Sequence, residues 1–207
     1  MPYVTPREVG YLPSRLTVRK KMVLELTKRQ QDILIGSILG DGYIYRQGKI
    51  QIEHSVEQKE YLFWKYQELQ SLAYSSPPAL VHRADKRTGR TYRAYRFWLR
   101  QYFRPWRALF YAEDATKRIP AFLQLSPMSL AVWYMDDGCW SDERCTLSTE
   151  SFSEESMQRI QNQLKEQYDI ATHVRSNGKL LIRAESRERF FSIIKAHVHK
   201  SLQYKIS

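Results

Sequence analysis

Two aspartates, Asp41 and Asp137, end apolar stretches of similar pattern and are well suited to bind a divalent cation. The stretches read LIGSILGDG at 34–42 and LAVWYMDDG at 130–138. Each predicts a helix that ends at Asp-Gly, where unpaired carbonyls carry partial negative charge. An acid at that end costs roughly 0.3–1 kcal/mol, which a bound cation would offset. One such motif is equally well explained as a helix stop with glycine at its C-cap, but two copies favour the chemical interpretation.

The elements around these aspartates predict a duplicated unit. Asp41 and Asp137 lie 96 positions apart, a spacing that indicates two half-domains and not a solenoid of short repeats. Small residues Gly36, Ser37 and Gly40 recur on neighbouring turns, so the first motif helix is expected to approach a second helix closely. We expect an N-terminal arm at 1–21 and half-domains at 22–119 and 120–207.

Periodicity and turn residues predict the same order of elements in each half. In the first half we expect helices at 28–40, 58–72 and 102–111 and strands at 43–46, 49–54, 80–84 and 91–99. In the second we expect helices from Ser126-Pro127 and at 153–168 and 186–198, with strands at 144–149, 171–176 and 179–184. Thr27 is the expected N-cap of the first motif helix.

Four segments resemble the LAGLIDADG homing endonucleases, in the branch that carries two motifs on one chain. They are LSPMSLAVWYMDDG at 125–138, KRIP at 117–120, QKEYLFWKY at 58–66 and the closing YK at 204–205. The motifs depart from the family pattern at Leu39, Met135 and Val132, which concern helix packing. The resemblance implies an α+β fold of two pseudo-twofold-related αββαββα half-domains, with saddle-shaped antiparallel sheets and both aspartates in one groove.

The resemblance also implies a site. Asp41 and Asp137 would hold two or more Mg²⁺ ions, with Mn²⁺ able to substitute, because Mg²⁺ favours hard oxygen ligands and phosphate. Further candidate ligands are Gly40 and Asp136 through their backbone carbonyls. The Asp136 side chain itself is expected to be a polar group at the helix end, since neighbours on a helix point about 100° apart.

Basic residues near the scissile phosphates assist catalysis in that family. Lys117 and Lys205 match these positions, and the alternative is that they are ordinary surface lysines. A polar residue that positions water is expected on the second strand. Gln51, Glu53 and His54 are the alternatives for it.

DNA contacts are expected from the sheets, because alternate residues of a strand face the same side. The candidates are Arg46, Lys49 and Gln51, then Arg83, Arg93 and Arg96, then Arg144, His173, Arg175, Lys179 and Arg183. For any single arginine, a solvated charge at a sheet edge is an equally ordinary explanation.

Composition agrees with a nucleic-acid partner. The 207 residues carry a formal net charge of +11, with a sequence pI near 9.6, as expected for a chain that binds a polyanion. No apolar run reaches the ~18 residues of a spanning helix, and no signal peptide is evident. Cys139 and Cys145 are interpreted as ordinary thiols. We expect an intracellular protein of a prokaryotic cytoplasm or an organelle.

These features predict a metal-dependent, site-specific double-strand DNA endonuclease that acts as a monomer, and the resemblance implies a long asymmetric target. An intron-encoded origin is favoured because no splicing domain flanks the motifs. The alternatives are an intron RNA maturase or a non-cleaving DNA-binding regulator on the same fold. A structural nucleic-acid coat protein would have no need of duplicated Asp-Gly helices.

Overall fold

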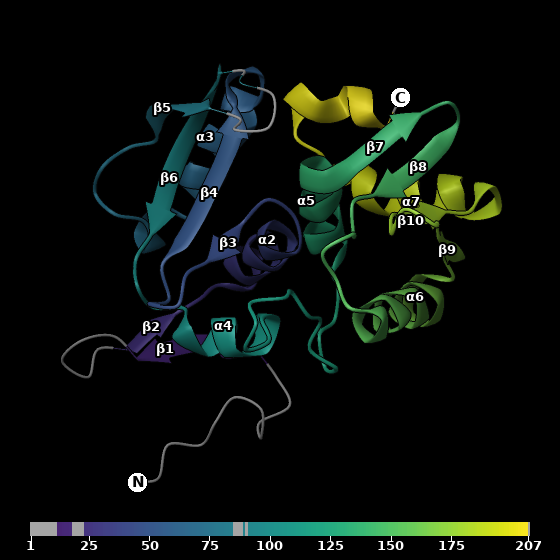
Figure 1. Cartoon of the computed structure of the whole chain (residues 1–207), viewed down its shortest axis with the longest axis horizontal. Helices are drawn as coiled ribbons and strands as arrows, with labels where there is room; N and C mark the ends of the chain where they lie inside the picture. Colours follow the sequence, from purple (N-terminus) through teal and green to yellow (C-terminus); the bar gives the residue numbers. More distant parts are fainter. Residues whose placement is uncertain (1–11, 18–22, 85–88, 90, 207) are drawn as a thin grey trace, which may run out of the picture.

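Two halves of similar architecture lie side by side and meet on the two motif helices, α2 (Lys28–Leu39) and α5 (Pro127–Asp137) (Figure 1). The computed structural model describes residues 12–17, 23–84, 89 and 91–206. Each half carries a four-stranded antiparallel sheet lateral to its motif helix. The expected α+β fold of two related halves is confirmed, while the division between residues 119 and 120 stays a prediction.

The motif helices begin and pack as their sequences predict. Thr27 and Gln30 form a reciprocal capping box at the start of α2, and Ser126 caps α5. Gly36 lies so close to α5 that a Cβ there would be 2.5 Å from the carbonyl oxygen of Ser129. Glycine is therefore required for this contact, and Val132 occupies the space opposite it.

The two sheets share one strand order. It is β3-β4-β6-β5 in the first half and β7-β8-β10-β9 in the second. The first sheet comprises β3 (Tyr43–Ile44), β4 (Ile50–Ser55), β5 (Ala79–Ala84) and β6 (Thr91–Leu99). The second comprises β7 (Gly138–Ser141), β8 (Arg144–Leu147), β9 (Thr172–Val174) and β10 (Leu180–Ile182).

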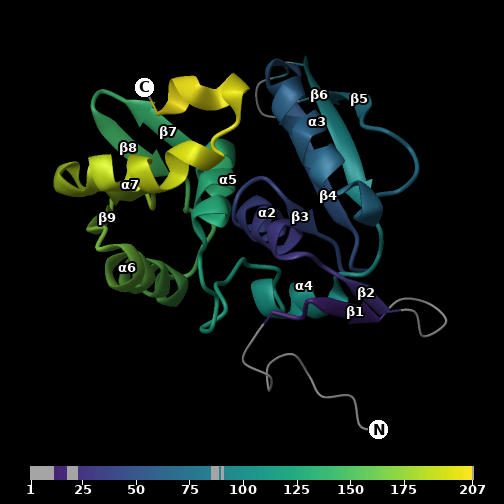
Figure 2. The same ribbon diagram turned by 180° about the vertical axis from the view of Figure 1, so that it is seen from behind.

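Helices cover one face of each sheet and leave the other face open (Figure 2). In the first half α3 (Lys59–Glu68) packs on β4 and β6, and α4 (Arg104–Phe110) returns the chain toward β3. In the second half α6 (Glu154–Tyr168) packs beside β9, and α7 (Arg187–Ile194) packs against α5. Residues of β4 alternate between buried and half-buried, so one row faces the core and the next row faces outward.

The structure corrects several expected boundaries. β7 was not predicted, because its sequence GCWS begins with glycine and lacks β-branched residues. The last long helix ends at Ile194, and short 3-10 helices at Lys195–His197 and Lys200–Lys205 follow. The reason is that Val198 and His199 are extended, which lets the C-terminal segment fold back onto α5.

The expected irregular arm at 1–21 is only partly described. Arg15–Thr17 forms β1, which pairs with β2 (Val23–Glu25), so this part is a strand and not irregular. The rest of the arm, apart from residues 12–14, lies outside the described residues. In the described parts of the chain, no helix has the length and apolar character needed to cross a membrane.

Candidate active site

Asp41 and Asp137 lie at the same end of the paired motif helices. Asp41 directly follows Gly40, the C-cap of α2, and Asp137 is the last residue of α5. The Asp41 side chain is 41% exposed, and Asp137 is half-buried. Both acids therefore remain accessible although the helices that carry them are buried.

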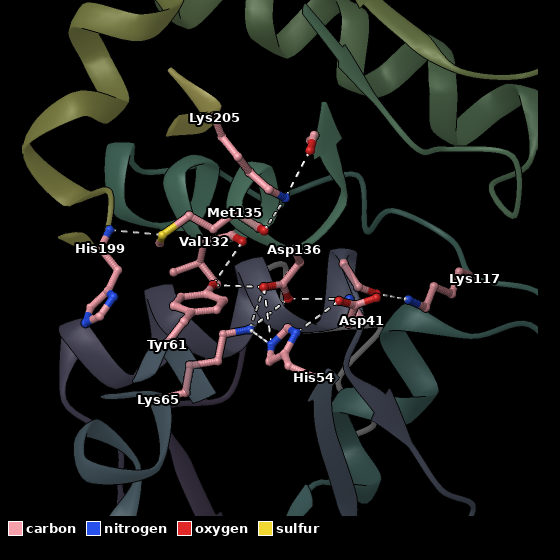
Figure 3. Close-up of polar contacts among 12 residues, drawn as sticks. Asp41, His54, Tyr61, Lys65, Lys117, Val132, Met135, Asp136, His199 and Lys205 are labelled. Carbon is pink, nitrogen blue, oxygen red and sulfur yellow. Dashed lines mark hydrogen bonds and ion pairs between the residues drawn. The ribbon is translucent and has the colours of Figure 1, made fainter. Parts of the chain in front are cut away.

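The structure brings both predicted lysines to the ends of the motif helices (Figure 3). The Nζ atom of Lys117 donates to the carbonyl oxygen of Gly40 at 2.6 Å. That of Lys205 donates to the carbonyls of Met135 at 2.7 Å and Gly138 at 3.0 Å. Each lysine thus contacts a different motif helix at its negative end, where a cation is favourable.

The electrostatics of the site are unequal in its two halves. Burial, together with repulsion from Asp41 and Asp136, raises the pKa of Asp137 to about 7. Burial also acts to raise the pKa of Asp41, but His54, Lys65 and Lys117 outweigh it and hold that pKa below its usual range. Burial lowers the pKa of Lys117 and of Lys205, against the nearby acids.

This donor set fits a divalent cation. Two carboxylates whose charges repel each other in a partly dehydrated site gain stability from a cation that neutralises both. Carboxylate oxygens with neighbouring carbonyls are the ligands that Mg²⁺ prefers. The Gly40 carbonyl oxygen already accepts a hydrogen bond from Lys117. A cation bound to this oxygen must therefore share it with the lysine or replace the lysine there.

A buried polar cluster connects the two halves beside Asp41, and two of its members, Lys65 and Tyr61, were not among the predicted site residues. Lys65 on α3 is fully buried and donates to both carboxylate oxygens of Asp136, at 2.6 and 2.8 Å. The hydroxyl of Tyr61 donates to Asp136 at 2.8 Å. His54 on β4 lies between them and Asp41, with its Nε2 3.1 Å from Lys65 Nζ and its Nδ1 3.3 Å from Asp41 Oδ2.

The sequence contained a signal for this cluster. Tyr61 and Lys65 on α3 and Leu69 at its C-cap are spaced four apart, so the lysine lies on the face that carries the buried residues. A lysine is almost never fully buried without an acidic partner. The partner, Asp136, belongs to the other half, so the pairing could not be inferred from helix geometry alone.

The carboxylate of Asp136, which lies at the helix end as expected, is not a free ligand. Its side chain is fully buried and already satisfied by Lys65 and Tyr61. Ligand atoms of Asp41, His54 and Asp136 do lie within 4.8 Å of one another. A cation among them would have to displace the ammonium of Lys65, so we assign no metal to this group.

The candidates for the water-positioning residue separate clearly. All three line one pocket with Asp41, and His54 is the one with a nitrogen 3.3 Å from the Asp41 carboxylate. Gln51 accepts a hydrogen bond from the hydroxyl of Tyr45. Glu53 pairs with Arg83 at 2.9 Å and with Arg96 at 2.5 Å.

Strand register decides which predicted DNA contacts share a face. Glu53 is opposite Arg96, so Arg96 lies on the open face of the first sheet, and Arg83 joins it there by its contact with Glu53. Arg93 is an odd number of residues from Arg96 and therefore faces the opposite side, which corrects its place in the predicted set. Lys49 lies 3.6 Å from the centre of the Trp98 ring, and Arg46 is exposed at the adjacent turn.

The second sheet presents its basic residues on one side. Cys145 and Leu147 of β8 and Leu180 and Ile182 of β10 are buried, so the residues between them face outward. By the same alternation the open face carries Arg144, His173, Arg175, Lys179 and Arg183. The structure therefore keeps this predicted group together.

Comparisons with known proteins agree with this architecture. Residues 31–190 match the family model described as the LAGLIDADG DNA endonuclease family. The chain is 30% identical to DNA endonuclease I-ChuI of Chlamydomonas applanata, over 89% of this chain and 97% of that protein. It is 26% identical to the cytochrome b mRNA maturase bI2 of Saccharomyces cerevisiae, over 84% of this chain and 46% of that protein.

The fold is also that of a solved structure, the homing endonuclease I-WcaI bound to its DNA recognition sequence. The TM-score is 0.77 at 22% identity, with 99% of each chain covered. Two motif helices that pack side by side, with an aspartate at the same end of each, define a two-motif nuclease fold. The chain belongs to the LAGLIDADG DNA endonuclease family.

Proposed function

We propose that this protein is a homing endonuclease that cuts both strands of one long, asymmetric DNA site as a monomer. The observation that carries the proposal is the convergence of Asp41, Asp137, Lys117 and Lys205 at the junction of the two motif helices. The similarity to I-ChuI, named a DNA endonuclease, supports it.

In this proposal Asp41 and Asp137, with the carbonyls of Gly40 and Asp136, hold the divalent ions. When bound, Mg²⁺ would stabilise charge on the attacking and leaving oxygens of the phosphodiester. Lys117 and Lys205 would stabilise negative charge on the scissile phosphates. Each ammonium is already held in place by a backbone carbonyl, so it is preorganised for this role.

The open faces of the sheets supply the binding surface. We propose that Arg46, Lys49, Arg83 and Arg96 contact one half of the target. Arg144, His173, Arg175, Lys179 and Arg183 would contact the other half. Two sheets that differ in sequence suit a target that is not a palindrome.

The test is cleavage of a randomised duplex pool with Mg²⁺, followed by Asp41→Asn and Asp137→Asn on the selected site. Each substitution removes a negative ligand while keeping side-chain shape, so double-strand cleavage should be abolished and DNA binding retained. Chelation of the metal with EDTA should have the same effect on the unmodified protein. Normal cleavage by either variant would contradict the assignment of these aspartates.

A second candidate function is an intron RNA maturase, favoured by the 26% identity to the maturase of Saccharomyces cerevisiae. A splicing assay with a host intron would test it, because stimulation of splicing by Asp41→Asn protein would show an activity independent of cleavage.

A further inference from the structure

The cluster of Asp136, Lys65, His54 and Tyr61 spans both halves of the molecule but has no symmetry-related copy among the described residues. Equivalent positions follow from the matching sheets, because the pair Tyr43–Gln51 corresponds to Cys139–Thr146. Three positions beyond Gln51 is His54, and three beyond Thr146 is Thr149. The hydroxyl of Thr149 donates its one proton to the Gly178 carbonyl at 2.6 Å, so that proton is not available to Asp137.

The other members of the cluster also lack counterparts. Counted from the first residues of α3 and α6, Lys65 corresponds to Ile160 and Tyr61 to Ser156. On the motif helices Gly40 corresponds to Asp136, since each directly precedes its motif aspartate. The equivalents therefore cannot form an ion pair, and of the two motif aspartates only Asp41 has a histidine beside it within the described part of the chain.

Hydrogen bonding fixes which nitrogen of His54 carries a proton. An ammonium group can only donate, so Nε2 of His54 accepts from Lys65 at 3.1 Å. The proton of the neutral ring then lies on Nδ1, the atom 3.3 Å from Asp41 Oδ2. This nitrogen is buried and forms no hydrogen bond among the residues that the structure describes, so it is an unsatisfied donor whose near neighbour is the Asp41 carboxylate. Lys65 thus directs an N–H group toward Asp41 (Figure 3).

Asp136 holds the arrangement from the second half. It fixes Lys65 through both carboxylate oxygens and also lies 3.4 Å from the backbone nitrogen of Asp41, which donates to it. The Asp136 carboxylate therefore positions Asp41 by two routes. It accepts a hydrogen bond from the Asp41 backbone, and it holds Lys65, which in turn contacts His54 beside the Asp41 side chain. Every side chain in this route except Asp41 is buried, so water does not compete with it.

We propose that Asp136, Lys65 and His54 are positioning residues that orient the Asp41 carboxylate, and that the two strand cleavages are consequently under unequal control. The inference rests on the proposed endonuclease function. A histidine N–H that holds one oxygen of Asp41 leaves the other oxygen directed outward for the cation. Losing such a partner of a metal ligand typically costs about 10- to 100-fold in metal affinity or activity.

The first experiment compares His54→Leu with His54→Asn on a selected DNA duplex carrying a different label on each strand. Asparagine can place an amide N–H near the position of Nδ1, and leucine cannot. Under single-turnover conditions His54→Leu should slow one strand about 10-fold or more relative to the other, and a nicked product should accumulate. His54→Asn should restore most of the balance between the strands.

The second experiment removes the anchor without leaving a buried charge. The double variant Lys65→Met/Asp136→Leu replaces the ion pair by apolar groups, an exchange that proteins often tolerate. It should keep a cooperative melting transition and shift the same strand as His54→Leu. Lys65→Met alone should melt at a lower temperature, because Asp136 is then buried without a counter-ion.

Thr149→Val is the matched control, since it removes the equivalent polar group of the second half. It should leave the strand ratio unchanged even if it lowers the melting temperature. Equal slowing of both strands by His54→Leu, in proportion to lost stability, would show a purely structural role and overturn the proposal. So would failure of His54→Asn to differ from His54→Leu.

A binding measurement separates this inference from the proposed function. Mn²⁺ titrated calorimetrically into the DNA-bound protein should bind His54→Leu about 10-fold or more weakly at one site. Unchanged Mn²⁺ affinity would overturn the positioning role. Absence of cleavage by the unmodified protein with Mg²⁺ or Mn²⁺ would overturn the proposed function, whereas cleavage with balanced strands in His54→Leu would overturn only the inference.

Discussion

Gly36→Ala should destabilise the protein, although alanine favours an isolated helix over glycine by about 1 kcal/mol. The added Cβ would lie 2.5 Å from the Ser129 carbonyl oxygen and 2.6 Å from the Cβ of Val132. Overpacking of a tight core costs about 1–3 kcal/mol, and a backbone neighbour favours the upper end of this range. Subtracting the gain in helix propensity leaves a loss of about 2 kcal/mol, using these two estimates.

Thermal unfolding measures the effect directly. A domain of this size loses about 2–4 °C in melting temperature per kcal/mol, so a decrease of about 4–8 °C is expected. Cleavage activity measured well below the melting transition, where the variant is still folded, should also fall. The reason is that forcing the helices apart separates Asp41 from Asp137. The double variant Gly36→Ala/Val132→Ala should recover only a small part of the loss, because it removes the contact with Cγ1 of Val132 at 2.9 Å and keeps the contact with its Cβ.

Ser37→Ala is the matched control on the next residue of the same helix. Ser37 is fully buried, and its hydroxyl has no hydrogen-bond partner among the described residues. Since an unsatisfied buried polar group costs about 1–3 kcal/mol, its removal should be neutral or stabilising. A Gly36→Ala protein that melts higher than the unmodified one would refute the close helix contact.

Two further predictions concern DNA. Lys117→Met or Lys205→Met should slow cleavage about 10-fold or more with a smaller change in binding. Each variant should favour a different nicked strand, since the lysines contact different motif helices. Rates equal to those of the unmodified protein on both strands in both variants would show that they are ordinary surface lysines. Target affinity should fall steeply with salt, by about 0.9 in log K per phosphate contact for each unit of log salt concentration; a titration without salt dependence would argue against a DNA partner.

Much of the fold was predictable because its signals are local. Thr27 and Ser126-Pro127 mark helix starts through chemistry confined to a few neighbouring residues, and both caps form as expected. The small residues of the first motif indicated close packing before any partner helix was known. β7 was missed since its pairing with β8 depends on the sheet as a whole and not on its own composition.

The buried part of the site was less accessible to prediction. The sequence places the Asp136 side chain about 100° from that of Asp137 around the helix. This direction is correct, but it does not show which residues pack against Asp136. Its partner Lys65 comes from another helix of the other half. Only tertiary contact decides whether such an acid is solvated, binds a metal or forms an ion pair.

The close contact of the motif helices also explains why the cluster has no symmetry-related copy. A Cβ at Gly40 would lie 2.5 Å from the Cβ of Asp136, so the two equivalent positions cannot both carry side chains. Once one of them is an acid, the buried charge requires a cation, and Lys65 supplies it from the half that lacks the acid. Gly40, Asp136 and Lys65 therefore form one unit, and replacing any one of them alone creates either a clash or an unpaired buried charge. The asymmetry of the site follows from the same helix contact that brings its two aspartates together.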